Sequence, residues 1–240
     1  MTLPIDKLEE WFLIDRVSNA CPYLPDREST LLYLDGRPIG RGYRELLDLG
    51  YRRSGPLVYR TDCGACRACQ IIRVPIDTFR RSKSQRRTWN RGQRLFTVRV
   101  EPPTTTVEKI AMYGRYLRAH HGRLDREVTE DEYRFFFEHT SLGRDTREVQ
   151  LYAGDRLAGV GLVDRLGDAL SSVYFYNDPD FRAHSPGTYS ALVEIELARH
   201  WGMRHYYLGY YVAGCGAMEY KARFRPCEIR TPDNADWVTL

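Results

Sequence analysis

Three cysteines separated by two-residue gaps, Cys63, Cys66 and Cys69, constrain the fold of this chain more than any other feature of its sequence. Thiolates at this spacing can bind one metal centre, because the short loop between them turns both sulfurs inward. A fourth thiol, Cys21, lies upstream, and four thiolates suit either tetrahedral zinc or an iron–sulfur cluster. The alternative is three inert thiols buried in a turn. We expect a metal-binding cysteine cluster in the N-terminal half.

The composition is that of a globular protein. Of 240 residues, 28% are charged and 42% are hydrophobic, which is enough for one large domain or two small ones. No apolar run approaches the ~18–20 residues that a membrane-spanning helix requires. In a reducing compartment the six cysteines do not imply disulfides. These features favour a cytoplasmic protein without a membrane partner.

Positive charge is concentrated in one part of the chain. Residues 52–100 contain thirteen Lys or Arg and two acids, so this stretch carries a net +11 and the remainder −7. Its most basic part, residues 80–94, has seven cations, one Trp and no acid. Such a segment can neutralise several phosphates and stack on a base or ribose. The alternative is a solvated helix face, but such faces usually interleave acids, so nucleic acid is the expected partner.

Periodicity and turn residues predict an α+β fold. The first 100 residues are expected to form an N-terminal α+β domain that carries the cysteine cluster. Its expected elements are a helix over 43–49, strands over 57–59, 71–74 and 96–100, and a helical or extended surface segment over 80–94. Residues 101–106 are the expected linker, since consecutive prolines stop a strand.

A second domain is expected over residues 107–240. Its expected elements are helices over 107–120, 130–139 and 188–201, and strands over 148–152, 157–164, 170–176 and 205–211. In this order, two helices come first, several strands follow, and a helix and a strand come last. Such an order of elements is typical of an α+β fold.

Two segments of this second domain carry groups suited to anions. The turn at Gly187 and Thr188 opens a helix, so its backbone N–H groups and the helix dipole can bind an anion. It resembles the phosphate-binding turn of GNAT-type acyltransferases, a fold that spreads two central strands to admit an acyl donor. A tyrosine-rich strand, residues 206–211, is followed by Tyr220 and Lys221, which suit a peptide or adenine wall and a carboxylate or phosphate. The alternatives are an ordinary turn and a half-exposed strand.

The chain as a whole resembles the aminoacyl-tRNA–protein transferases, the family of arginyltransferases and bacterial aspartate/glutamate leucyltransferases. In the N-terminal half the likeness rests on Cys21-Pro22-Tyr23-Leu24, Gly50-Tyr51-Arg52-Arg53-Ser54-Gly55, the cysteine triplet and residues 79–87. In the C-terminal half it rests on Leu170-Ser171-Ser172-Val173-Tyr174, Asp178-Pro179-Asp180, Gly187-Thr188-Tyr189, Leu208-Gly209-Tyr210-Tyr211 and residues 218–226. So many segments in the same order make a chance match implausible.

The resemblance implies a GNAT-like second domain that transfers an amino acid from aminoacyl-tRNA to proteins beginning with Asp or Glu, which marks them for degradation. It also implies a zinc or iron–sulfur site at Cys21, Cys63, Cys66 and Cys69. The implied tRNA contacts are Arg80, Arg81, Lys83, Arg86, Arg87 and Arg91. One departure concerns the donor: relatives usually carry Lys before the methionine at 218, where this chain has Ala217. Leucine and arginine both stay open as the transferred residue.

The implied chemistry is aminolysis of an ester that is already activated. Aligning the two substrates can supply on the order of 7–11 kcal/mol at best, so neither a covalent intermediate nor a cofactor is needed for the transfer. A carboxylate or a ribose hydroxyl can accept the proton of the amine. The candidates are Asp164 and Asp178 as base or orienter, with Tyr189 and Tyr210 as hydrogen-bond partners. Both aspartates have a structural alternative, at a strand end and in a turn before proline.

Acceptor recognition requires cations for the Asp or Glu side chain. Arg52, Arg53 and Lys221 are the expected carboxylate partners, and the further substrate contacts are Gly187, Thr188 and Tyr220. Two other functions stay open. An acyl-CoA-dependent GNAT-type N-acyltransferase would leave the basic segment and the cysteines unexplained, and a metal-bearing RNA-binding protein without catalysis would leave the second domain unexplained.

Overall fold

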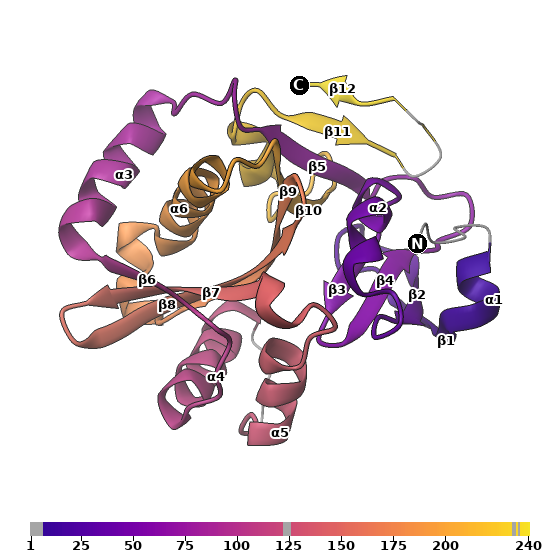
Figure 1. The fold of residues 1–240 in the computed structure, drawn as a ribbon, viewed down its shortest axis with the longest axis horizontal. Helices are drawn as coiled ribbons and strands as arrows, with labels where there is room; N and C mark the ends of the chain where they lie inside the picture. Colours follow the sequence, from indigo (N-terminus) through magenta and orange to yellow (C-terminus); the bar gives the residue numbers. More distant parts are fainter. Residues whose placement is uncertain (1–6, 122–125, 232–233, 235) are drawn as a thin grey trace.

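The computed structural model describes residues 7–121, 126–231, 234 and 236–240, which form two β-sheets with helices packed around them (Figure 1). The smaller sheet has the strand order β1-β2-β4-β3, with antiparallel neighbours throughout. Its strands are β1 (Leu13–Ala20), β2 (Glu28–Asp35), β3 (Arg52–Ser54) and β4 (Leu57–Thr61). The helical segments beside it are α1 (Leu8–Phe12), η2 (Gly40–Gly42) and α2 (Tyr43–Asp48).

The smaller sheet has one face in a core and the other toward a cavity. Alternate residues of a strand point to opposite faces, and on β2 the fully buried Leu32 and Leu34 pack with Leu46 and Leu47 of α2. Between them, the half-buried Tyr33 points to the opposite face. This alternation leaves a second, partly apolar face of the small sheet for contacts elsewhere in the molecule.

The larger sheet has eight strands in the order β12-β11-β5-β10-β9-β8-β7-β6. They are β5 (Gln70–Pro75), β6 (Thr97–Glu101), β7 (Thr146–Ala153), β8 (Arg156–Leu166), β9 (Ala169–Asn177), β10 (His205–Tyr211), β11 (Glu228–Arg230) and β12 (Val238–Thr239). The pairs are antiparallel except for β9 with β10, which are parallel because α6 lies between them in the chain.

Helices cover both faces of this sheet. On one side lie α3 (Lys83–Leu95) and α6 (Pro186–His200), and on the other α4 (Val107–His121) and α5 (Glu130–Tyr133) with the π-helical turn η3 (Arg134–Glu138) (Figure 1). Strand β8 is therefore buried on both faces: Leu162 packs with Met112 of α4, whereas Val163 packs with Leu192 of α6. Short 3-10 helices, η4 (Gly143–Asp145), η5 (Pro179–His184) and η6 (Glu219–Arg223), complete the chain.

The α+β class and the elements with strong periodicity are confirmed. The strand over 205–211 matches β10 residue for residue, and the helices over 107–120 and 188–201 match α4 and α6 within two residues. Residues 80–94 contain a true helix, α3, which begins with a capping box between Ser82 and Gln85. The five strands β1, β2, β3, β11 and β12 were not anticipated.

The two sheets do not divide at the expected linker. Strands β5 and β6, which precede residue 102, belong to the larger sheet, and β5 pairs with both β10 and β11. Residues 102–106 themselves contact the larger sheet, because the amide of Thr104 donates to Glu148 on β7. Within the described residues, no helix is long and apolar enough to cross a membrane.

Candidate active site

The parallel strands β9 and β10 spread apart along their length. Their pairing covers His205 with Ala169, Tyr206 with Leu170 and Tyr207 with Ser171. The register of β10 then shifts at Gly209, whose φ of +91° is accessible chiefly to glycine, and β10 continues in pairing with β5. Strand β9 runs on to Asn177 along β8. The spread of two central strands, expected for a GNAT-like fold, is therefore present.

Two cations lie where the strands diverge. Arg52, only 5% exposed, donates through Nη2 to the carbonyl oxygen of Ser172 on β9. Lys221 of η6 donates through Nζ to the carbonyl oxygen of Tyr210 on β10 at 2.6 Å. Both side chains come within 3.6 Å of the position that a Cβ would take at Gly209, so glycine leaves the space that they share. Arg52 and Lys221 thus form one cationic site between the two strands.

Neither cation of this site has a carboxylate partner among the described ion pairs. The Nη1 atom of Arg52 is buried and has no hydrogen-bond partner in the described part of the chain. Burial, and then the charge of Arg52, lower the pKa of Lys221 to about 7, while Cys215 acts in the opposite direction. An anion bound beside Lys221 would offset both effects, so the site favours a carboxylate or phosphate.

The next residue along β3, Arg53, has a different environment. Its Nε and Nη2 donate to the two oxygens of Asp164 at 2.7 and 2.9 Å, and both side chains are fully buried. Its Nη1 donates to the carbonyl oxygen of Gly55, and Thr146 adds a hydrogen bond to Asp164. Both oxygens of Asp164 are occupied, so neither is free to take a proton from a substrate. The arrangement is typical of a structural ion pair.

Asp178 is also engaged by protein groups. It is 1% exposed, caps η5 by accepting from the amide of Asp180, and accepts from Arg115 and Arg156. Burial opposes ionisation, but these hydrogen bonds outweigh it and hold the pKa of Asp178 below its usual value. A carboxylate with a low pKa is a weak base. Asp178 shapes the turn that leads from β9 into α6.

The two candidate tyrosines lie in different places. Tyr189 packs against Trp89 and Phe96, with ring centroids 5.6 Å away in each case. A Cβ at Gly92 would lie 2.2 Å from its ring, so this glycine lets α3 approach α6. Tyr210 lies at the diverging strands, where its hydroxyl donates to the carbonyl oxygen of Gly50 and accepts from the amide of Thr61.

The remaining expected substrate contacts surround the end of β9 and η6. Gly187 and Thr188 are in the first turn of α6, where backbone N–H groups lack intrahelical acceptors. Gly187 lies beside the ring of Phe175 on β9. Tyr220, next to Lys221, is 42% exposed. The structure therefore brings Arg52, Lys221 and Tyr210 together and leaves Arg53, Asp164 and Tyr189 within the protein interior.

One buried carboxyl group was missed from the sequence. Glu194 of α6 is 1% exposed and accepts hydrogen bonds from Ser190 at 2.9 Å and from Tyr206 of β10 at 2.6 Å. Burial raises its pKa to about 7 despite these bonds. Ser172 hydrogen-bonds to Glu194 through its side chain and to Arg52 through its carbonyl. The signal was an acid within the apolar run of residues 191–198.

A cavity of about 310 Å³ opens on the same side as the small sheet. Residues from β2, β4, β9 and β10, the turn η3 and the cysteine loop line it. Val173 and Tyr174 on β9 and Tyr210 on β10 all lie beyond the paired part of these strands. The cavity is therefore continuous with the opening between β9 and β10.

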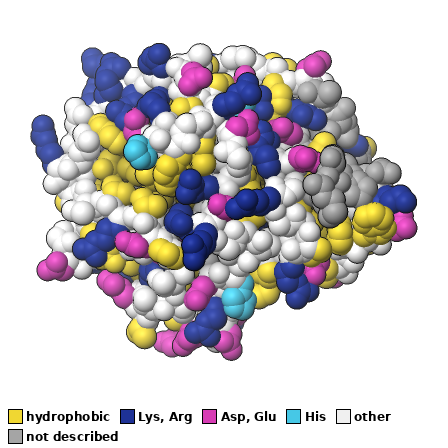
Figure 2. Space-filling model, in the orientation of Figure 1, with side chains coloured by type: hydrophobic (Ala, Val, Ile, Leu, Met, Phe, Trp, Pro, Cys, Tyr) yellow, Lys and Arg dark blue, Asp and Glu magenta, His cyan; other side chains and the backbone are white. Residues whose placement is uncertain are grey.

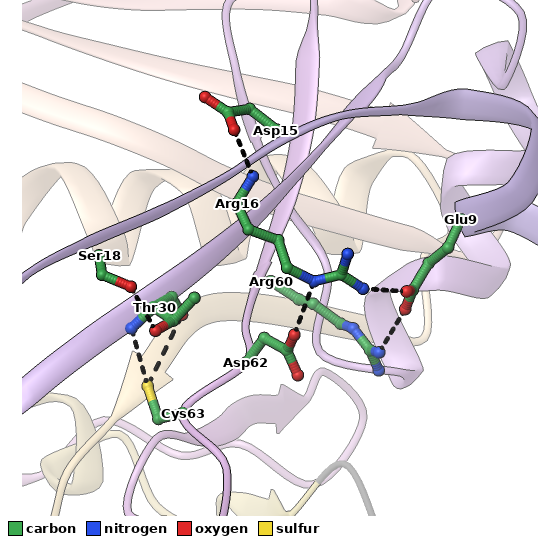
Figure 3. Close-up of polar contacts among 8 residues, drawn as sticks. All are labelled: Glu9, Asp15, Arg16, Ser18, Thr30, Arg60, Asp62 and Cys63. Carbon is green, nitrogen blue, oxygen red and sulfur yellow. Dashed lines mark hydrogen bonds and ion pairs between the residues drawn. The ribbon is translucent and has the colours of Figure 1, made fainter.

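The four expected metal ligands, Cys21, Cys63, Cys66 and Cys69, border this cavity. Cys63 contacts the backbone of Thr30 on β2 through its sulfur, and this contact holds the cysteine loop against the small sheet (Figure 3). Burial, and then the neighbouring thiols, raise the pKa of Cys69 to about 12. Cys215, which the sequence did not connect with the others, packs in the same cluster as Cys69.

The cysteines match a thiophilic metal in kind but do not converge in position. Soft thiol ligands suit zinc or an iron–sulfur cluster. Yet no three His, Cys, Asp or Glu side chains of the described residues lie close enough together to hold a metal ion. No chemical step is therefore derived from a metal at this cluster.

The basic segment forms a one-sided surface on α3. Its most buried residues, Gln85 and Gly92, face the protein, while Lys83, Arg86, Arg87, Arg91 and Arg94 are exposed. These cations recur at helical spacing, and Figure 2 shows Lys and Arg side chains gathered over this part of the molecule. The cations before the helix are engaged: Arg80 donates to Asp77 and Phe79 carbonyls, and Arg81 pairs with Glu196 and stacks on Trp89.

The basic helix is tied to the cationic site. Gln85, at its first turn, donates through Nε2 to the carbonyl oxygen of Arg223 in η6, two residues after Lys221. A polyanion on the outer face of α3 would therefore lie on a surface connected to the diverging strands.

Comparison with known proteins places this geometry in a family. Residues 19–87 match the family model described as Arginine-tRNA-protein transferase, N terminus, and residues 108–231 match the C-terminus model. An aspartate/glutamate leucyltransferase of Hahella chejuensis is 35% identical, covering 92% of this chain and 93% of the relative. One of Chromohalobacter salexigens is 39% identical, covering 88% and 87%.

Solved structures share the fold at low sequence identity. FemX is similar with a TM-score of 0.51 and 11% identity, covering 82% of this chain and 67% of that chain. The C-terminal domain of a putative lysylphosphatidylglycerol synthetase from Agrobacterium fabrum has a TM-score of 0.50 and 16% identity, covering 70% and 61%. With both family models matched over most of the sequence, this chain belongs to the arginine-tRNA-protein transferase family.

Proposed function

We propose that the protein transfers leucine from leucyl-tRNA to the N-terminal α-amine of proteins that begin with Asp or Glu, in the cytoplasm, where charged tRNA is used. The product would carry an N-terminal leucine that serves as a degradation signal. Leucine, rather than arginine, is supported by the relatives named aspartate/glutamate leucyltransferase, which align along nearly the whole chain.

The observation that carries this proposal is the cationic site between β9 and β10. Lys221 is half-buried and its ammonium is held by the Tyr210 carbonyl, so it is placed to bind the side-chain carboxylate of the acceptor. Arg52 lies behind it, almost fully buried, and adds positive potential. An acceptor with an acidic first residue would supply the negative charge that this site lacks.

The reaction needs alignment more than chemical assistance. The acceptor α-amine attacks the ester carbonyl carbon of leucyl-tRNA, forming the peptide C–N bond while the bond to the ribose oxygen breaks. The amine gives up one proton and the departing ribose oxygen takes one, so an amide and an alcohol result. Asp164 and Asp178 are held by arginines, and we assign the proton to the ribose oxygen. Tyr210, through its carbonyl, orients Lys221 for the acceptor.

The outer face of α3 is the proposed tRNA-binding surface. Arg86, Arg87 and Arg91 are exposed there, and recognition through phosphates suits an RNA duplex. Replacing Arg86 and Arg87 by Ala should weaken tRNA binding and reduce the slope of log affinity against log salt by about 1.4–1.8, at 0.7–0.9 per contact. The side chain of Arg41 is exposed beside the small sheet, so an Arg41→Ala variant serves as the control. An unchanged slope would remove α3 from the interface.

A metal with a structural role is proposed at Cys21, Cys63, Cys66 and Cys69, whose thiols would have to draw together around it. Zinc or an iron–sulfur cluster would bridge the cysteine loop and the β1–β2 turn. Anaerobic purification followed by metal analysis and absorption spectroscopy should detect it, and Cys66→Ser should lose the metal and lower stability. A Cys66→Ser protein with the same metal content and stability as the wild type would contradict this role.

The decisive assay offers peptides starting with Asp, Glu and Lys to the protein, with separately charged leucyl- and arginyl-tRNA. Leucine should be transferred to the Asp and Glu peptides and not to the Lys peptide. Protection by coenzyme A in a thermal shift, without any transfer, would favour an acyl-CoA-dependent enzyme. Binding of tRNA without transfer from either donor would favour an RNA-binding protein.

A further inference from the structure

The cavity of about 310 Å³ beside the diverging strands is lined by neither Arg52 nor Lys221 nor the exposed cations of α3. Its size is at the lower end of the range for ligand pockets, about 300–1,000 Å³. Its walls and its position indicate which group it receives.

The walls are largely apolar and aromatic. Leu31 and Tyr33 of β2 line one side, where the ring of Tyr33 lies 5.7 Å from that of Tyr59 on β4. Val173 of β9 and Val212, directly after β10, line the other. A cavity with hydrocarbon and ring faces on opposite sides favours a branched apolar group.

Two of the tyrosines that line the cavity, Tyr174 and Tyr210, have hydroxyls that hydrogen-bond to protein groups. The hydroxyl of Tyr210 is held by Gly50 and Thr61. The hydroxyl of Tyr174 hydrogen-bonds to Tyr113 and Tyr116. These two hydroxyls are therefore not free to hydrogen-bond to the edge of a base such as adenine.

Charges that border the cavity are either neutralised or exposed. Arg53 is paired with Asp164, with both side chains fully buried. Arg27 and Glu28 are exposed to solvent. Among the described lining residues, no buried carboxylate is free to pair with a cationic ligand.

The cavity and the cationic site meet at one residue. The ring of Tyr210 lines the cavity, while its carbonyl oxygen accepts the hydrogen bond of Lys221. An apolar group in the cavity and a carboxylate on Lys221 would therefore be neighbours. Such proximity is what a reaction that joins two substrates requires.

We propose that this cavity binds the side chain of the amino acid carried by tRNA and selects leucine over arginine. This inference rests on the proposed function, since it assigns the donor to one part of that site. The acceptor has an acidic side chain that matches Lys221, and the donor has an apolar one that matches the cavity. Burying a leucine side chain here is favourable, whereas burying a guanidinium without a carboxylate partner is costly.

The test uses one tRNA body charged in turn with leucine, alanine, phenylalanine and arginine, so that only the side chain differs. With an Asp-starting peptide as acceptor, leucine should exceed both alanine and arginine in kcat/KM by at least about tenfold. Val173→Phe would fill the cavity and should abolish the advantage of leucine over alanine. Val238→Phe, on the exposed edge strand β12 and outside the cavity lining, is the matched control and should retain it.

A second variant keeps the test independent of whether Val173→Phe folds. Leu31→Ala would enlarge the cavity and should raise phenylalanine transfer relative to leucine. Unchanged side-chain ratios in the folded cavity variants would overturn the inference alone. Equal transfer of leucine and arginine by the wild type would overturn it together with the choice of leucine as the donor. No transfer of any amino acid by the wild type would overturn the proposed function as well.

Discussion

Arg52 and Arg53 are neighbours on β3, yet their surroundings differ in almost every respect. Arg53 is fully buried, binds both oxygens of Asp164 and donates its remaining group to a carbonyl. Arg52 is also buried, but it has one carbonyl partner, one unpaired nitrogen among the described contacts, and a second cation beside it. Because successive strand residues point to opposite faces, one strand serves both environments.

The difference distinguishes a structural charge from a functional one. A buried cation is tolerated when a carboxylate compensates it, as for Arg53. A buried cation without compensation is costly, and Arg52 even lowers the pKa of Lys221 beside it. Uncompensated charge next to a cavity is typical of a site completed by its ligand. The sequence motif Arg52-Arg53 treats the two residues as equivalent, and the fold separates them.

The largest expected effect is the loss of stability when the ion pair between Arg53 and Asp164 is broken. Asp164→Asn leaves Arg53 charged, buried and unpaired, so the free energy of unfolding should fall by about 3–5 kcal/mol. Urea denaturation measures this change, and Asp155→Asn, in an exposed turn, is the matched control. If Asp164→Asn were as stable as its control, the ion pair would not hold the two sheets together.

The cationic site of Arg52 and Lys221 should control how kcat/KM depends on pH. Transfer to an Asp peptide needs a neutral acceptor amine, with a pKa of about 7.7–8.0, and a protonated Lys221, whose pKa is about 7. The amine makes kcat/KM rise with pH, and Lys221 makes it fall above neutrality, so the profile should be bell-shaped. Lys221→Met should lose the falling limb. A falling limb that persists in this variant would assign it to another group.

A smaller effect is expected for Arg52. Arg52→Met removes a cation that already lacks a carboxylate, so the free energy of unfolding should change by only about 1 kcal/mol or less. The pKa of Lys221 should rise, because Arg52 is one of the causes that lower it, and the falling limb should move to higher pH. Arg41→Met is the surface control. A loss of stability as large as that of Asp164→Asn would make the two arginines alike.

Hydrophobic periodicity and turn residues were enough to predict many of the helices and strands. Strand β10 and helices α4 and α6 have strong periodicity and turn signals at their ends, and they were placed within two residues. Strand β1 was missed because its residues are exposed throughout and show no apolar alternation. The membership of β5 in the larger sheet was missed because short buried strands do not encode their partners locally.

The site was harder to predict than the elements. Arg52 and Lys221 come from opposite ends of the chain, and their proximity depends on the bulge at Gly209 and on how the small sheet packs. Asp164 and Arg53 were both expected at the site, and their mutual pairing could not be read from spacing. Glu194 escaped notice because an acid in a largely apolar helix gives no sign of its hydrogen-bond partners.

The most direct test of the account compares an Asp-starting peptide with its neutral Asn counterpart as leucine acceptors. Near neutral pH, the wild type should prefer Asp in kcat/KM by about tenfold or more, since a hydrogen bond to a charged group contributes about 1.5–3 kcal/mol. A folded Lys221→Met variant should bring the ratio close to one while still transferring leucine. A ratio that stays at the wild-type value in Lys221→Met would contradict the placement of the acceptor between β9 and β10.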